Sequence, residues 1–171
     1  CTGLTMEELM RYNGYIPNSY GLLNDYTDED LDMLEKIKSA RKTNFSEFKN
    51  LTVLSKEHSK VLENKESGLF QTSKGSYIEW DRNKSIIDLS LKTKYGYRSF
   101  YFKSPNIMRL IFNTGWFEYE VAELISKWKY AKEVWLNIIY PYDNQNPKNE
   151  IDIIVNTGYK LLMIECKTQI V

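Results

Sequence analysis

Two short apolar segments near the end of the chain constrain its fold more than any other part of the sequence. Residues 149–155 and 161–167 are rich in Ile, Leu and Val, and the Asn-Thr-Gly run at 156–158 between them is typical of a tight turn. The pattern predicts a β-hairpin in this region.

Four charged residues interrupt these apolar strands at regular intervals. Because side chains alternate between the two faces of a strand, Glu150 and Asp152 share one face of the first strand. Glu165 and Lys167 share one face of the second strand by the same rule. Such alternation also occurs in half-exposed strands, where a Glu–Lys pair is an ordinary surface feature without a functional role. Both strands here, however, are more apolar than half-exposed strands usually are.

The pairing register of this hairpin is not fixed by the sequence. One register places Asp152 opposite Met163 and diagonal to Glu165, and a shift of two residues places Asp152 directly opposite Glu165. In both cases the carboxylates come close enough to repel each other among apolar residues, where unpaired charge is costly. A divalent cation resolves this conflict, and Lys167 beside it can orient water or offset charge on a phosphate.

The rest of the chain predicts helices followed by strands. A capping box at Thr5 and an N-cap at Thr27 predict two helices, and the Thr27 helix has an apolar stripe of Leu31, Leu34, Ile37 and Ala40. Further helices are expected at residues 46–63 and 116–130. The expected strands are 77–80, 86–89, 97–102, 134–140, 150–155 and 161–168.

The expected helix at residues 116–130 offers a further acidic residue. Its apolar face consists of Phe117, Val121, Leu124, Ile125 and Trp128. Glu118 and Glu120 lie at opposite margins of this face, so helix geometry alone leaves both open as residues that point toward the sheet.

Aromatic residues gather at positions 95–101, with Tyr95, Tyr97, Phe100 and Tyr101. We expect them to form a packed sheet face, and a platform on which nucleic-acid bases stack is the alternative.

The net charge and the cysteine content of the chain argue against some classes of function. The net charge is zero, which argues mildly against a non-specific nucleic-acid binder. Two cysteines, Cys1 and Cys166, give no disulfide framework or zinc site, so a reducing, cytoplasmic location is expected. The single histidine, His58, is expected on a solvated helix. No apolar stretch is long enough to span a membrane.

The arrangement of Asp152, Glu165-Cys166-Lys167 and the upstream Gly115-Trp116-Phe117-Glu118 resembles the PD-(D/E)xK nuclease superfamily. Within it, the chain is similar to CRISPR-ancillary nucleases, in which a CARF domain that senses cyclic oligoadenylate precedes the nuclease domain. Ile151 stands where the superfamily usually has Pro. The resemblance covers residues 115–168.

The resemblance implies a metal-dependent endonuclease that cleaves DNA, with RNA as a further substrate. Asp152, Glu165 and Glu118 would bind Mg2+ or Mn2+, and Lys167 would act on water and phosphate; Glu150 is an additional acidic candidate. Cyclic oligoadenylate would act only through a sensor domain outside this chain, and a homodimer is a further expected assembly.

Two other interpretations stay open. The strand pair also resembles Holliday-junction-resolvase-like and restriction-type nucleases. A non-catalytic nucleic-acid-binding module with a degenerate nuclease fold is the interpretation from a different class.

These patterns predict an α/β domain at residues 105–171, with a mixed sheet beside the helix at 116–130. A mainly helical connector with a β-hairpin is expected at residues 1–104, which makes the chain α+β as a whole. Since the chain does not start with Met and stops four residues after Lys167, we expect a fragment of a larger protein.

Overall fold

The computed structural model describes residues 3–53, 65–140 and 149–168. It has an α+β fold with two separate four-stranded sheets, and within the described residues every strand pairing is antiparallel. The prediction of an α+β chain is therefore confirmed. The prediction of a mixed sheet is wrong for the described strands. The strands at 149–156 and 161–164 are joined by a tight turn and therefore pair antiparallel, and the strand at 133–140 runs antiparallel to the first of them.

By compactness the chain forms two units. The first contains residues 1–25 and 117–171, and the second contains residues 26–116. The sequence was divided differently, at residue 104, because hydrophobic patterning does not show that the N-terminal segment pairs with strands more than a hundred residues away. That pairing joins β1 (Ser19–Gly21) to β6 (Glu133–Tyr140) in an antiparallel arrangement.

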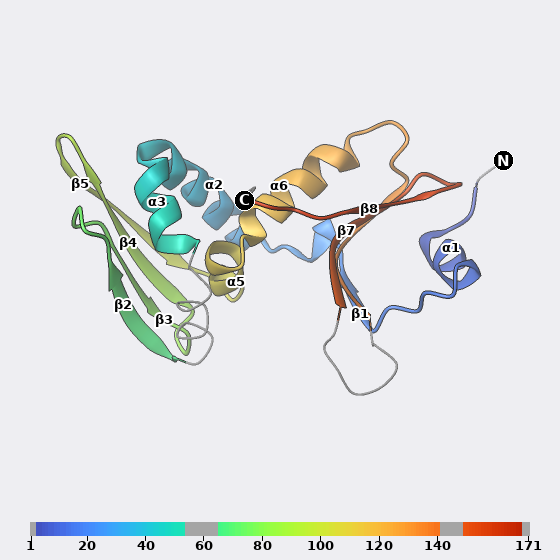
Figure 1. Ribbon diagram of the computed structural model, residues 1–171, viewed down its shortest axis with the longest axis horizontal. Helices are drawn as coiled ribbons and strands as arrows, with labels where there is room; N and C mark the ends of the chain where they lie inside the picture. The colour runs from blue at the N-terminus through green and yellow to red at the C-terminus, as the bar shows by residue number, and fades with distance from the viewer. Residues whose placement is uncertain (1–2, 54–64, 141–148, 169–171) are drawn as a thin grey trace. The chain divides into compact units, whose positions relative to one another are not determined.

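The sheet of the first unit has the strand order β1-β6-β7-β8 (Figure 1). Its elements are α1 (Met6–Tyr12), β1 (Ser19–Gly21), the short 3-10 helix η1 (Leu23–Asp25), β6 (Glu133–Tyr140), β7 (Asn149–Asn156) and β8 (Leu161–Ile164). α6 (Gly115–Ser126) precedes β6 in the chain. Met6 and Met10 of α1 pack against a buried cluster on the sheet, made of Trp135, Ile138 and Ile154.

Polar contacts attach the start of α1 to this sheet. The side chain of Thr5 accepts a hydrogen bond from the Glu8 amide, and the Glu8 carboxylate accepts one from the Thr5 amide, so the predicted capping box is confirmed. Glu133 accepts from the Met6 amide at 2.6 Å and from Asn156 Nδ2 at 2.7 Å. The buried Asn156 thus connects the hairpin turn to the helix.

The second unit is a four-stranded meander with helices on one face (Figure 1). Its elements are α2 (Asp28–Thr43), α3 (Phe45–Thr52), β2 (Ser67–Gln71), β3 (Tyr77–Asp81), β4 (Ile86–Thr93), β5 (Gly96–Lys103) and α5 (Ile107–Phe112). The strands expected at 77–80, 86–89 and 97–102 are β3, β4 and β5, and β2 is a further strand that was not expected. Its core contains large buried side chains from both layers, including Ile37, Phe48, Leu51, Ile78, Ile87, Leu89 and Phe102.

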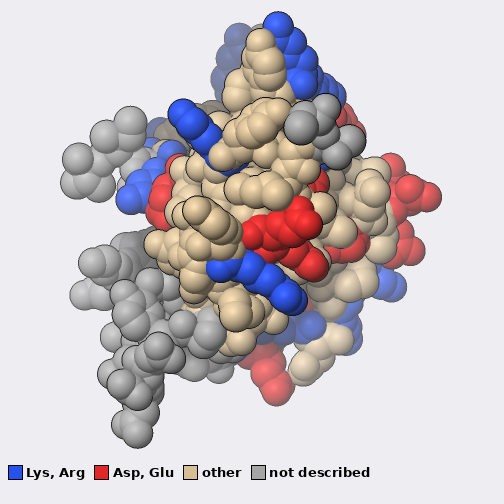
Figure 2. Space-filling view, turned by 90° about the vertical axis from the view of Figure 1, so that its right-hand side faces the viewer, with Lys and Arg blue, Asp and Glu red and all other residues tan. Residues whose placement is uncertain are grey.

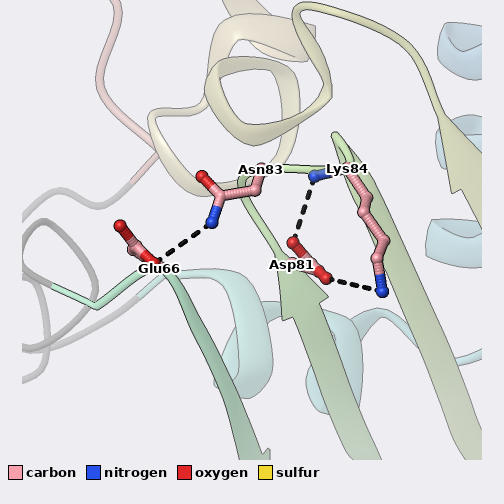
Figure 3. Close-up of polar contacts among 4 residues, drawn as sticks. All are labelled: Glu66, Asp81, Asn83 and Lys84. Atoms are coloured by element: carbon pink, nitrogen blue, oxygen red, sulfur yellow. Dashed lines mark hydrogen bonds and ion pairs between the residues drawn. The ribbon is translucent and has the colours of Figure 1, made fainter.

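The turn between β3 and β4 joins the two strands that were expected at residues 77–80 and 86–89. Asp81 accepts a hydrogen bond from the Lys84 amide at 3.1 Å and forms an ion pair with Lys84 Nζ at 3.3 Å, while Asn83 donates to Glu66 at 3.1 Å (Figure 3). The hydrogen bond from the Lys84 backbone lowers the pKa of Asp81. The turn is thus closed by contacts among Asp81, Asn83 and Lys84 and by Glu66, which directly precedes β2.

Several boundaries differ from the expected ones. The helix expected at 46–63 is α3, which ends at Thr52, and residues 54–64, including His58, lie outside the described residues. α6 ends at Ser126, and Leu124 is 71 % exposed, so the apolar face predicted through Trp128 is wrong. In α2, Met33 is buried and Leu31 is exposed.

A buried carboxylate in the second unit gives a pH-dependent prediction. Burial alone would raise the pKa of Glu47, but hydrogen bonds from Ser76 and Thr72 and the nearby charge of Lys74 hold that pKa below its ordinary value. The hydroxyl of Thr72 donates to Glu47 at 2.6 Å. Because the unfolded chain binds this proton more readily, the contribution of Glu47 to stability is present at neutral pH and is lost as the pH falls below about 4.

We expect Glu47→Gln to flatten the acid limb of the stability profile. The measurement is urea unfolding at pH 3 to 7, with the exposed Glu79→Gln as the matched control. An acid limb that is equally steep in both variants would contradict this assignment.

Candidate functional site

The pairing of β7 with β8 fixes the register that the sequence left open. Ile153 pairs with Ile164 and Ile154 with Met163. One step beyond the last pair of this ladder, Asp152 lies opposite Glu165, which is the second of the two expected registers. However, β8 ends at Ile164, so Glu165 and Lys167 follow the ladder instead of belonging to it. The strand expected to reach Thr168 is therefore shorter than predicted.

Directly after β8, a side chain accepts the hydrogen bond that a backbone carbonyl would accept in a regular ladder. The Cys166 amide donates a hydrogen bond to Asp152 Oδ2 at 2.5 Å. Hydrogen bonds from an amide to an ionised carboxylate are short and strong. This bond ends the regular pairing of β8 and holds the Asp152 carboxylate beside the segment that contains Glu165.

Three carboxylates act on the thiol that lies between Glu165 and Lys167. The pKa of Cys166 is raised to about 11, first by burial and then by the negative charges of Asp152, Glu118 and Glu165. Electrostatic repulsion of this kind requires the charges to lie near the sulfur. The acids come from β7, α6 and the segment after β8, so the fold gathers residues that are far apart in the sequence.

Glu118 is the most buried of these acids. It lies in the first turn of α6 and is only 8 % exposed. A carboxylate is favourable at this end of a helix because the N-terminal turn carries partial positive charge. Helix geometry left Glu118 and Glu120 open, and in the structure Glu118 is buried whereas Glu120 is half-buried.

The other two candidates lie at exposed positions. Lys167 is exposed, one residue after Cys166. Glu150 is exposed too and pairs across the sheet with Ile139 of β6.

The acids do not converge on one point. Within the part of the chain that the structure describes, no group of three or more His, Cys, Asp or Glu side chains is arranged to hold a metal ion. The donors are nevertheless of the right type, since Mg2+ and Mn2+ prefer carboxylate and amide oxygens. The residues therefore fit such an ion in the chemistry of their donor atoms.

One residue near the acids was missed by the sequence analysis. Asn137 of β6 lies between Leu136 and Ile138, which pair with Ile153 and Ile151, so it stands opposite Asp152. Its φ is +49°, in the left-handed region, and its Oδ1 is buried without a hydrogen-bond partner. This amide oxygen, on the strand opposite Asp152, is a further oxygen donor of the kind that binds hard cations. The only sequence signal was a polar residue inside an otherwise apolar strand.

The thiol gives a test of this geometry that does not depend on any enzyme assay. With a pKa of about 11, about 0.1 % of Cys166 is thiolate at pH 8. We expect iodoacetamide to alkylate it on the order of 100-fold more slowly than free cysteine. Asp152→Asn should lower the thiol pKa and speed alkylation, measured by mass spectrometry in a Cys1→Ser background. Alkylation at the rate of free cysteine would contradict the arrangement.

Charge on the surface is mixed. Figure 2 shows acidic and basic side chains interspersed on a mostly uncharged face, in keeping with the zero net charge of the chain. Among the described residues, no helix is long and apolar enough to cross a bilayer.

Comparison with known proteins adds no family assignment. No protein-family model matches the sequence, and no curated protein is significantly similar to it.

Proposed function

We propose that this chain is the core of a metal-dependent endonuclease that hydrolyses phosphodiester bonds of DNA, and also of RNA. The observation that supports the proposal best is the hydrogen bond from the Cys166 amide to Asp152, which holds Asp152 beside the segment of Glu165 and Lys167. The negative charges of Asp152, Glu118 and Glu165 all raise the pKa of the Cys166 thiol, in keeping with acids that lie near one another. A cation bound between neighbouring carboxylates would offset the repulsion between their negative charges.

In this proposal Asp152, Glu165 and Glu118 would hold Mg2+ or Mn2+. When bound, such an ion supplies positive charge that stabilises the phosphate in the transition state. Lys167 orients the attacking water and donates to the phosphate oxygen on which negative charge grows. Asp152 keeps its position because one of its oxygens accepts from the Cys166 amide.

The resemblance extends this proposal to a biological setting. The parent protein would be a cytoplasmic antiviral effector switched on by cyclic oligoadenylate bound to a separate sensor domain. Junction-resolving and restriction-type nucleases share the same strand pattern, so the substrate panel should include a four-way junction.

The test is cleavage of labelled single strands, plasmid, RNA and a four-way junction with Mn2+ or Mg2+. We expect the metal-dependent product to fall by about 100-fold or more in Lys167→Ala, the range seen when one group that stabilises transition-state charge is removed. Lys127→Ala is the matched control, because Lys127 is exposed on the surface and pairs with Glu123 at 2.9 Å. Equal activity of the two variants would remove Lys167 from the mechanism.

A second candidate function is a non-catalytic nucleic-acid-binding module. It is favoured by the absence, among the described residues, of any three donors arranged around one point. Such a module would bind nucleic acid but show neither cleavage nor metal binding that depends on Asp152.

A further inference from the structure

The turn between β4 and β5 borders an open groove in the second unit. The groove has a volume of about 630 Å³. Its walls come from the turn and from the junction of α2 with α3, and they are formed by Thr43, Asn44, Thr93, Lys94, Tyr95, Tyr97 and Arg98. None of these residues is acidic, and the lining is both aromatic and basic.

Hydrogen bonds fix the shape of this turn. Thr93 Oγ1 donates to the Gly96 carbonyl at 3.1 Å and accepts from the Tyr95 amide at 3.2 Å. Asn44, the N-cap of α3, donates from Nδ2 to the Lys92 carbonyl at 2.9 Å. The two walls are thus connected, and the groove does not need to be ordered by a ligand.

Two tyrosine rings are exposed at this site. Tyr95 is 88 % exposed and Tyr97 is 56 % exposed. The expectation of a packed aromatic face is therefore wrong for these two residues and for Tyr101, which is also exposed. Tyr95 lies in the turn, and Tyr97 and Tyr101 lie on the opposite face of β5 from the buried Phe102. Tyr97 pairs with Lys92, and its hydroxyl lies close to Gly75 in the turn between β2 and β3. As ladder partners, Tyr97 and Lys92 have their side chains on the same face of the sheet.

A lysine ammonium group lies near each of the two tyrosine rings. Lys94 Nζ lies 4.6 Å from the centre of the Tyr95 ring, and Lys92 Nζ lies 4.4 Å from that of Tyr97. Arg98 adds a third positive charge beside the groove. In a chain with zero net charge, three cations within seven residues and no acid among the lining residues make a local positive site.

We propose that this groove binds single-stranded nucleic acid. A base stacks on Tyr95 and a neighbouring base packs against Tyr97, while Lys94 and Arg98 contact the phosphates. Stacking requires unpaired bases, which favours a single strand over a duplex. The inference rests on the proposed function, because it names the form of nucleic acid that the candidate nuclease would take.

The exposed tyrosine rings distinguish a single-stranded nucleic acid from other anionic ligands. An acidic peptide would satisfy the cations but would leave two exposed rings without a stacking partner. The test therefore includes a poly-glutamate peptide as a competitor.

The experiment measures binding of fluorescein-labelled dT12 and rU12 to the 171-residue chain in EDTA, by fluorescence anisotropy at several salt concentrations. Without metal, binding is separated from cleavage. We expect Tyr95→Ala to weaken binding by about 5- to 150-fold, the effect of losing one stacked base. Lys94→Ala should reduce the slope of log K against log salt by about 0.7 in magnitude, the value for one phosphate contact on a single strand.

The hairpin between β7 and β8 supplies a matched control, since it too has an adjacent exposed tyrosine and lysine. Tyr159→Ala and Lys160→Ala should leave binding unchanged, and thermal melting should show that all variants are folded. The inference is overturned if the single strands do not bind, if Tyr159→Ala weakens binding as much as Tyr95→Ala, or if duplex or poly-glutamate binds as tightly as dT12. Binding without any metal-dependent cleavage would support the groove and count against the proposed nuclease.

Discussion

Asp152→Asn should lower metal-dependent cleavage by about 100-fold or more, the largest functional effect expected for a single substitution in this chain. Asparagine keeps an oxygen that can accept the hydrogen bond from the Cys166 amide, so the local structure should be retained. What is lost is the negative charge that the proposed cation would need. The measurement is the initial rate of cleavage with Mn2+.

The matched control is Asp88→Asn, which changes an exposed carboxylate on a strand of the other sheet. It should leave the rate within about 2-fold of the unmodified chain, as surface substitutions have small effects. If Asp152→Asn retained full activity, Asp152 would not be part of the reaction centre.

Trp135→Ala should have the largest effect on stability. Trp135 is 5 % exposed, lies in the cluster between α1 and the β1-β6-β7-β8 sheet, and stacks on Tyr20 with ring centres 3.6 Å apart. Removing a buried indole costs about 3–5 kcal/mol through lost burial and the cavity left behind. The measurement is the free energy of unfolding from urea denaturation.

Tyr12→Ala is the control for this aromatic deletion, because Tyr12 lies on α1 and is 87 % exposed. It should change the free energy of unfolding by about 0.5 kcal/mol or less. Equal losses in the two variants would show that the Trp135 cluster is not the core of the first unit.

Local signals predicted much of the fold. The caps at Thr5 and Thr27 and the hairpin around residues 156–158 were found in the structure, because hydrogen bonding and backbone geometry at these points depend on a few adjacent residues. The pairing of β1 with β6 was not predicted, since no local pattern encodes a partner so distant in the sequence.

The candidate site was predicted only in part. Alternation along the strands placed Asp152 near Glu165, but it gave no sign that Asp152 itself would take the Cys166 amide and end β8 at Ile164. Where a strand ends can depend on whether a side chain or a backbone group accepts the next amide hydrogen bond. The alternation of apolar and polar residues does not reveal this competition. The left-handed Asn137 and the exposed ring of Tyr97 depend likewise on the neighbouring strands.

Titration of Mn2+ into the chain by isothermal calorimetry tests the central claim most directly, namely that the acids near Cys166 form an ion site. We expect a saturable heat that disappears in Asp152→Asn and Glu118→Gln and persists in Asp88→Asn. No saturable heat, or heat that is the same in all of these proteins, would contradict the metal site and favour a non-catalytic module.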